Sequence, residues 1–441
     1  MEQDVASKVN EFGHWLLENN AIDNMIYVMS IFLICAFFVV SVTKKLKLPS
    51  VVGYVILGVL LSVNVMRLLP FFSIEQKEWY YYTTESMMFI SEITLAFIAF
   101  TVGSELSVKI IKKMGKSVAY ITVLQVCMTF LVVTLALLAL GKSLHLALIF
   151  GVIATVTAPS TTVMTINEYK ANGPVTSLIM ATVGIGAAMA LFIYSLVSPL
   201  AYIIYSGQGS ISMVNSLLVP VFKILGAVFI GTLIGSISLY IITNLQDKTK
   251  KILLILATIV GGLGISKYFG VSPLIANMSI GFVYRNFAKK NLGIAEYLDT
   301  FTIPLYAFFF ILAGVEIRFD GVLESSFLLL AFVYTFSRIV GKISGATWGA
   351  KISKSDDKIR RYVGLGILPQ GGVALALAFS ASRQFEGADQ IGILIFNTIL
   401  FTAILSEIFG PLFAKYSLTK SGEIKEVAKP NQSKIVKGSG L

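Results

Sequence analysis

Residues 154–164 read ATVTAPSTTVM, which places a proline and five hydroxyl side chains inside an otherwise apolar stretch of the chain. Proline removes a helix hydrogen bond and clashes with the preceding turn, so it leaves backbone groups without helical partners. Within a bilayer such groups are tolerated only against protein or a water-filled cavity. The hydroxyl groups that could satisfy them or coordinate an ion belong to Thr155, Thr157, Ser160, Thr161 and Thr162. Pro159 is therefore expected to mark an ion site, unless it marks a plain kink whose hydroxyls bond back to the backbone.

A second interruption, GILPQGGVALALAF at residues 366–379, lies at the corresponding place in the second half of the chain. It carries Pro369 and Gln370, followed by two glycines. Paired Gly/Pro-interrupted segments at matching positions of two halves are the best sequence pointer to the binding site of a transporter. We therefore predict one shared transport site formed by Thr157, Pro159, Ser160, Thr161, Pro369 and Gln370.

The elements that position these residues are membrane helices. Of the 441 residues, 56% are hydrophobic and 13% are charged, and the mean hydropathy is +0.81. Soluble domains carry about 25% charged residues, so the chain is an integral membrane protein. Apolar runs long enough to cross the hydrocarbon layer recur throughout the sequence, which predicts an all-α polytopic membrane protein with about 13 transmembrane helices. The expected spans are 25–43, 50–68, 84–105, 118–140, 144–167, 175–207, 213–243, 250–268, 271–285, 296–317, 321–347, 361–382 and 389–415.

These spans divide into two six-helix repeats joined by one further span, which inverts the second repeat relative to the first. The polar N-terminal segment lacks the basic start and cleavage site of a signal peptide, so the first span is expected to remain as a membrane helix. The predicted divisions are an extracytoplasmic segment at 1–24, a first repeat at 25–208, a linking span at 209–249, a second repeat at 250–415 and a basic cytoplasmic tail at 416–441.

Lysine and arginine set the expected orientation, because cytoplasmic loops of membrane proteins are enriched in them. Alternate loops and the C-terminal tail carry 25 of these residues, against 7 in the other set. The N-terminus is therefore expected outside and the C-terminus in the cytoplasm, with the chain in the plasma (cell) membrane. The same asymmetry accounts for the net charge of +11 without a nucleic-acid partner.

The sequence contains no pattern typical of a metal site, a cofactor site or an enzyme. The two cysteines and the two histidines are isolated, so we expect neither a metal site nor a cofactor besides the transported ions. No catalytic motif is present, and we expect no enzyme activity. The expected partners are the lipid bilayer, monovalent ions and protons.

Several segments resemble the monovalent cation:proton antiporter superfamily in both sequence and order. They are LPSVVGYVILGVLL, SEITLAFIAFTVGSEL, SPLIANMSIGFV, PLYAFFFILAGVEI, YTFSRIVGKISGATWGA, ILPQGGVALALAF and LSEIFGPLFAKYSLTKSGEI. The resemblance implies a mobile core domain in which the fifth and twelfth spans are broken and cross. It also implies a scaffold domain that forms a homodimer, and charged residues beside the crossing on the sixth and eleventh spans.

The sixth span departs from the family at its most important position. Members of the superfamily usually carry an Asp-Asp, Asn-Asp or Gln-Asp pair there, whereas this sequence reads LIMATVGIGAAMALF. Gly186 and Ala187 stand at the positions of the acidic pair. In such antiporters one carboxylate binds either a proton or a cation, so the usual carboxylate is missing.

Other ionisable residues remain inside the predicted spans and are candidates for function. Arg338 lies deep in the eleventh span, Lys342 follows one turn later on the same face, and Glu92 lies in the third span. We include these three among the ion-binding candidates. For Lys342, as for Lys223 and Glu407, a structural ion pair or a snorkelling side chain is the alternative.

Three functions fit the sequence. The first is a secondary transporter that exchanges Na⁺ or K⁺ for protons by alternating access, with Glu92 or another acid replacing the missing pair. The second keeps the fold but transports an anion, or transports without coupling, around Arg338. The third is a receptor that does not transport. The family pattern favours the first function, whereas the missing acids favour the other two.

Overall fold

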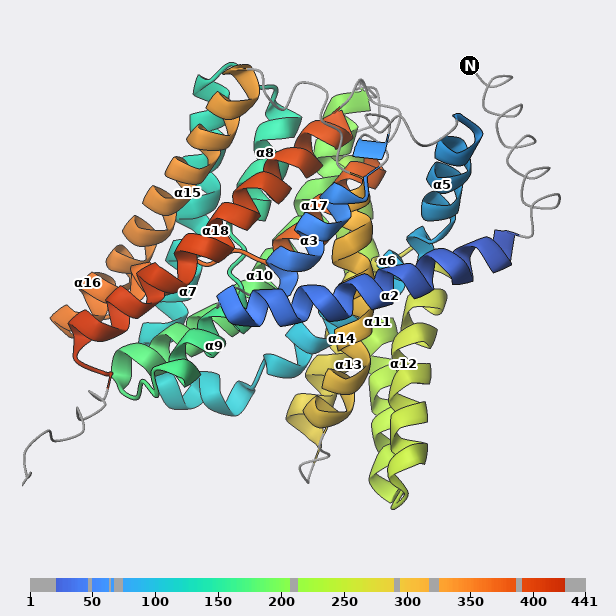
Figure 1. The fold of residues 1–441 in the computed structure, drawn as a ribbon. Coiled ribbons are helices and arrows are strands. Elements are labelled where there is room, and N and C mark those ends of the chain that lie inside the picture. Colours follow the sequence, from blue (N-terminus) through green and yellow to red (C-terminus); the bar gives the residue numbers. More distant parts are fainter. Residues whose placement is uncertain are drawn as a thin grey trace, which may run out of the picture.

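The computed structural model describes residues 21–46, 50–62, 65–66, 74–206, 213–288, 294–316, 325–385 and 391–424, and all regular structure within them is helical (Figure 1). The first half comprises α2 (Ala21–Leu46), α3 (Ser50–Leu60), α5 (Ile74–Ser86), α6 (Met88–Glu105), α7 (Val108–Ala139), α8 (Leu144–Ala154), α9 (Pro159–Glu168) and α10 (Pro174–Ser206). The linking helix is α11 (Met213–Asn244). The second half comprises α12 (Lys248–Tyr268), α13 (Pro273–Phe287), α14 (Ile294–Val315), α15 (Ser325–Ile352), α16 (Asp357–Gly366), α17 (Gly372–Gln384) and α18 (Ile391–Ser421).

Within the described residues, each predicted span falls on one helix or on two consecutive helices; the third span begins in α5 and continues through α6. Among the described residues, eight helices are long and apolar enough to cross a membrane, and three apolar helices are shorter. The fifth predicted span is divided into α8 and α9, and the twelfth is divided into α16 and α17. The prediction of a polytopic all-α membrane protein with two broken helices is therefore confirmed.

Helix packing follows the inverted repeat. In the predicted order α3 corresponds to α13, and α6 corresponds to α14. The structure packs α3 against α14 and α6 against α13, which are equivalent contacts when the two halves are exchanged. The central helices α7 and α15 correspond to each other and pack together. This arrangement is the one expected for two inverted six-helix repeats.

A line of three glycines allows α7 and α15 to approach closely. A Cβ atom added to Gly341, Gly345 or Gly349 would lie 2.5–2.6 Å from a Cα atom of α7. Small residues at intervals of four are a common device for close helix packing in membranes. The facing residues on α7 are Thr129, Gln125 and Ile121.

The end of α18 is joined to the beginning of α10 by Glu423. Its carboxylate accepts hydrogen bonds from the backbone N–H groups of Val175 and Thr176 at 2.8 and 2.7 Å, and from the Thr176 hydroxyl at 2.7 Å. The first N–H groups of a helix have no partner within the helix, and a carboxylate there is also favoured by the helix dipole. Glu423 therefore caps α10 with a residue from the far end of the chain.

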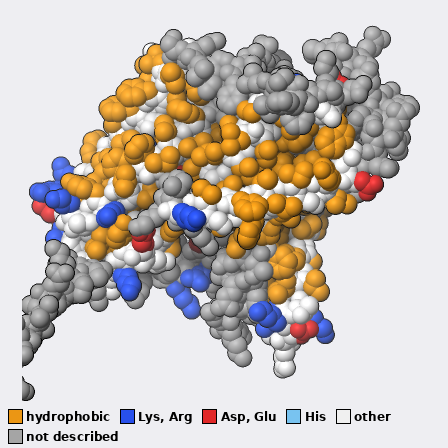
Figure 2. Space-filling model, viewed as in Figure 1, with side chains coloured by type: hydrophobic (Ala, Val, Ile, Leu, Met, Phe, Trp, Pro, Cys, Tyr) orange, Lys and Arg blue, Asp and Glu red, His pale blue; other side chains and the backbone are white. Residues whose placement is uncertain are grey.

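Apolar side chains cover much of the outer surface. Figure 2 shows hydrophobic side chains over most of the visible face, with lysine and arginine gathered toward its left and lower edges. Helices α2 and α11 expose large side chains such as Phe37 (69%) and Phe229 (68%). Exposed aromatic and aliphatic side chains on long helices are expected where lipid surrounds the protein.

Candidate ion site at the crossing of two broken helices

The two broken helices meet at their interruptions. Helix α8 ends at Ala154 and α9 begins at Pro159, whereas α16 ends at Gly366 and α17 begins at Gly372. The backbone N–H of Ala158 donates a 2.9 Å hydrogen bond to the carbonyl oxygen of Pro369, so the two irregular segments touch. Proline at the first position of α9 has no N–H to leave unsatisfied. Both predicted breaks therefore contribute to one crossing.

Arg338 lies against the C-terminal, negative ends of α8 and α16, each of which is the first half of a broken helix. This side chain is 2% exposed and projects from α15 toward the C-terminal ends of α8 and α16. Its Nε and Nη2 donate to the carbonyl oxygens of Ala154 and Val156 at 3.1 and 3.0 Å, and Nη1 donates to the carbonyl oxygen of Leu368 at 2.8 Å. Carbonyl groups at helix C-termini carry partial negative charge and favour a cation.

Lys342 binds the same interruption one turn further along α15. Its Nζ donates to the carbonyl oxygen of Thr155 at 2.9 Å, to Oγ1 of Thr157 at 2.6 Å and to Oε1 of Gln125 at 3.4 Å. The side chain is fully buried. Three acceptors match the three hydrogens of an ammonium group. Lys342 thus occupies a position where carbonyl, hydroxyl and amide oxygens converge on a cation.

Glu407 lies at the opposite, positive ends of the half-helices. This residue of α18 is 3% exposed, and its Oε2 accepts a 2.6 Å hydrogen bond from the Thr161 hydroxyl in the first turn of α9. Its Oε1 lies against Gly371, the residue that precedes α17, so closely that a Cβ atom at Gly371 would collide with it. Two helix N-termini therefore face one carboxylate, an arrangement that favours negative charge.

The structure places most of the predicted transport residues at this crossing. Thr157 contacts Lys342, Thr161 contacts Glu407, Pro159 begins α9, and Pro369 accepts the hydrogen bond from Ala158. Gln370 donates to the Tyr334 hydroxyl at 2.9 Å and to the Ile153 carbonyl oxygen at 3.5 Å. Ser160 lies in the first turn of α9, and its side chain is outside the described part of the structure.

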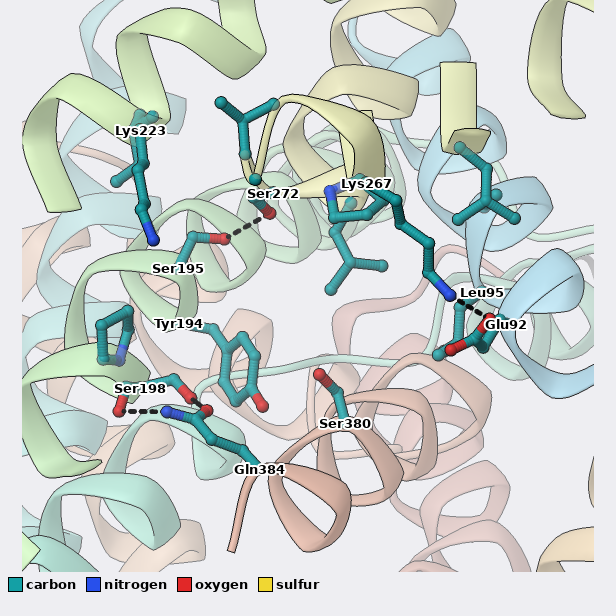
Figure 3. A pocket seen from close by; sticks show the side chains of 18 residues that line it. Glu92, Leu95, Tyr194, Ser195, Ser198, Lys223, Lys267, Ser272, Ser380 and Gln384 are labelled. Carbon is teal, nitrogen blue, oxygen red and sulfur yellow. Dashed lines mark hydrogen bonds and ion pairs between the residues drawn. The ribbon is translucent and has the colours of Figure 1, made fainter. Parts of the chain in front are cut away.

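Glu92 lies away from the crossing, in the wall of a separate cavity of about 360 Å³. The cavity is bounded by α10 and α17 on one side and by α6, α11 and the α12–α13 turn on the other. Figure 3 shows Glu92 paired with Lys267, and Lys223 extending from α11. The hydroxyls of Ser195 on α10 and Ser272 in the α12–α13 turn, which belong to opposite sides of the cavity, lie 3.5 Å apart. This places Glu92 beside a partly exposed lysine rather than at the helix ends.

Gly186 and Ala187, which the sequence resemblance predicts at the positions of the acidic pair, are buried within α10. A Cβ atom added to Gly186 would lie 3.1 Å from Nε2 of Gln125. Gln125 also contacts Lys342 through its Oε1 atom, at 3.4 Å. Gly186 therefore lies in close contact with Gln125, the partner of a buried lysine.

Three residues of this site were not among the predicted site residues. Gln125 is a polar residue within the apolar span 118–140, Tyr334 precedes Arg338 by one turn, and Glu407 is an acidic residue within the last predicted span. A polar or charged side chain within an apolar run was the available signal for each. The signal marks a residue as unusual but does not indicate which helix it contacts.

The paired half-helices, the charges at their ends and the inverted repeat define a polytopic membrane protein of the transporter class. The family described as "Sodium/hydrogen exchanger, transmembrane" matches residues 30–415. The chain belongs to this family.

Curated relatives and solved structures agree with that membership. The chain is 25% identical over 392 residues to the Na(+)/H(+) antiporter NhaH of Halobacillus aidingensis, covering 83% of this chain and 91% of that protein. It is 23% identical over 408 residues to NhaH of Halobacillus dabanensis, covering 86% and 95%. The structure of the sodium proton antiporter MjNhaP1 from Methanocaldococcus jannaschii at pH 8 is similar with a TM-score of 0.71 and 19% identity, covering 91% and 99%.

Proposed function

We propose that this protein is a secondary transporter that exchanges a monovalent cation, Na⁺ or K⁺, for protons by alternating access. The observation that carries the proposal is the position of Glu407, a buried carboxylate between the positive ends of α9 and α17. Relatives named as Na(+)/H(+) antiporters support the same conclusion.

Glu407 can replace the missing acidic pair, because one buried carboxylate is sufficient for a proton and a cation to compete for the same site. A proton neutralises it by covalent attachment, and a cation neutralises it by coordination, so the two exclude each other. An uncompensated charge inside a membrane is costly, which makes the empty carboxylate unfavourable during movement across the barrier. Thr161 adds a hydroxyl oxygen beside the carboxylate. Arg338 and Lys342 hold the opposite helix ends and so keep the two interruptions together around the site.

The cavity beside Glu92 fits an entrance between two moving parts. One wall is formed by α10 and α17, which belong with the broken helices, and the other by α6, α11 and the α12–α13 turn. Ser380 in its wall lies about 12 Å along α17 from the crossing, at 1.5 Å per residue. If the lysine-rich loops are cytoplasmic, this cavity opens outside the cell, and the structure represents an outward-open state. A homodimer formed through the scaffold helices in the plasma membrane completes the proposal.

Transport of an anion around Arg338 is the main alternative. Three donor nitrogens of Arg338 are engaged by carbonyl oxygens of the two interruptions. These contacts favour a role in holding the half-helices over a role in binding a transported anion.

The test is proton movement in proteoliposomes that contain a pH-sensitive dye and receive pulses of Na⁺, K⁺ or Li⁺. We expect the wild type to release protons in response to at least Na⁺ or K⁺, and Glu407→Gln to lose this response. Glu92→Gln is the matched control because it also removes a glutamate from a membrane helix, and it should retain exchange. Undiminished exchange in a folded Glu407→Gln protein would overturn the role of Glu407, and a wild type that moves no protons would overturn the proposed function.

A further inference from the structure

The amide of Gln125 has a fixed orientation. Its Oε1 atom must face Lys342, because an amide nitrogen in that place would point its N–H donors at the N–H donors of the ammonium group. The Nε2 atom is therefore turned toward Gly186 on α10. Nε2 has no hydrogen-bond partner among the described residues, although the side chain is fully buried. Buried donors without partners are uncommon in folded proteins and call for a ligand, an ion or water.

Two further buried hydroxyls without partners lie on the same two helix faces. Thr122 precedes Gln125 by one turn on α7, and Thr182 precedes Gly186 by one turn on α10. Within the described part of the chain, neither hydroxyl oxygen has a hydrogen-bond partner, and both residues are at most 1% exposed. The Cγ2 atom of Thr122 would lie 3.9 Å from a Cβ atom at Gly186. Three buried polar groups without partners thus lie on the two helix faces that meet near Gly186.

The charge at the crossing favours an anion over a neutral ligand. Arg338 and Lys342 are buried cations, whereas Glu407 is a buried acid that lies at the other ends of the half-helices. In relatives with an acidic pair, carboxylates in the sixth span supply the balancing charge. Here the Gln125 amide N–H group faces Gly186, and the unpartnered hydroxyls of Thr122 and Thr182 lie one turn away on the same two helices. All of these groups can donate to an anion. Charge-assisted hydrogen bonds to an anion are about twice as strong as neutral ones.

We propose that a small monovalent inorganic anion of the halide class binds between α7 and α10 beside Gly186, held by Nε2 of Gln125 and the hydroxyls of Thr122 and Thr182. The anion takes the place of the family's carboxylate and balances Lys342 through Gln125. A Cβ atom at Gly186 would lie 3.1 Å from Nε2 and have one other neighbour within 4 Å, the Thr122 methyl group, so the anion would lie to the side of Gly186, within hydrogen-bond distance of the amide. The binding of the anion stands independently of transport, whereas its effect on exchange rests on the proposed function.

The binding test uses purified protein exchanged into sodium gluconate, with chloride or bromide added at constant sodium concentration and ionic strength. We expect a saturable rise in the unfolding temperature with chloride and bromide and none with sulfate, which is larger and divalent. In bromide-soaked crystals, anomalous scattering should show one peak between Gln125 and Gly186. Equal unfolding temperatures in gluconate, chloride and bromide, or a bromide-treated crystal with only water at this position, would overturn the proposal.

Two variants separate the site from a general salt effect. Gly186→Asp introduces a tethered carboxylate and should remove the chloride response while keeping the protein folded. Gln125→Leu removes the donor and should also remove the response. Gly261→Ala, at a glycine of α12 with open space around it, should respond like the wild type. A chloride response that persists in both Gly186→Asp and Gln125→Leu would place the anion elsewhere and sink the assignment.

Proteoliposome assays then distinguish the two proposals. Cation-dependent proton movement that requires chloride in the wild type, but not in Gly186→Asp, is the expected result. Chloride stabilisation without any cation:proton exchange would overturn the proposed function and leave the anion site standing. Exchange that proceeds equally in gluconate would remove the anion from the transport cycle.

Discussion

At the scale of single residues, the crossing is organised by opposite charges at opposite helix ends. Arg338 and Lys342 contact carbonyl oxygens where α8 and α16 end, and Glu407 lies where α9 and α17 begin. Each charge thereby meets backbone dipoles of the other sign. Gly371 makes the arrangement possible, because any larger residue would displace the carboxylate from the start of α17.

The first residue-scale prediction concerns this glycine. Gly371→Ala places a methyl group against Oε1 of Glu407 and 3.2 Å from Cβ of Ala158. Crowding of this kind costs about 1–3 kcal/mol, and we expect the exchange rate to fall by about tenfold or more. Proteoliposome rates measure the effect, with Gly261→Ala as control. An unchanged rate in Gly371→Ala would show that the Glu407 carboxylate does not need its position beside α17.

Residue identities predicted part of this site. Pro159 and Pro369 marked both interruptions because proline cannot continue a helix, and Arg338 was recognisable as a charge far from either membrane surface. The contact between Glu407 and Thr161 was not predictable, because it depends on how α18 is rotated against α9. The orientation of Gln125 likewise depends on Lys342, which is 217 residues further along the chain. Spacing within one span carries no information on such pairings.

At the scale of elements, glycines determine which helices approach most closely. Apolar runs predicted the helices themselves, since each span needs enough apolar residues to cross the hydrocarbon layer. They did not predict the contact of α7 with α15, which depends on Gly341, Gly345 and Gly349. The sequence YTFSRIVGKISGATWGA contains these three glycines together with Arg338 and Lys342. One helix face therefore sets both the close packing and the position of the two cations.

Substitution of Gly345, the middle one of the three glycines, tests this packing. Gly345→Leu would force α7 and α15 apart, because a Cβ atom alone would lie 2.5 Å from Cα of Gln125. We expect the free energy of unfolding to fall by about 3 kcal/mol or more, with a clear drop in the unfolding temperature in detergent. Gly264→Leu is the matched control, since a Cβ atom at Gly264 has nothing within 4 Å. Equal unfolding temperatures for the two variants would contradict the close contact.

At the scale of the whole molecule, the lysine and arginine content of the loops predicts the orientation in the membrane. The loops assigned to the cytoplasm carry most of the lysine and arginine. The turn between α7 and α8 and the turn between α11 and α12 belong to opposite sides in this scheme. The same assignment places the cavity beside Glu92 on the outer side.

Cysteine labelling checks this orientation. In a background without Cys35 and Cys127, a membrane-impermeant maleimide should label Ser143→Cys in intact cells, because this residue lies in a turn predicted to be outside. Asp247→Cys should be labelled only after the cells are opened, because it lies in a turn predicted to be cytoplasmic. Each variant is the control for the other. The reverse pattern would show that the lysine-rich loops face outward.

The separation of charges at the crossing also has a consequence for membrane voltage. Arg338, Lys342 and Glu407 together carry one net positive charge when Glu407 is ionised and nothing is bound. Moving one elementary charge through the full membrane field corresponds to about 2.3 kcal/mol per 100 mV. An empty core that shifts along the membrane normal would therefore be drawn toward the negative side. An anion beside Gly186 cancels this net charge, so that the anion composition of the medium would determine whether the resting potential favours one state of the transporter.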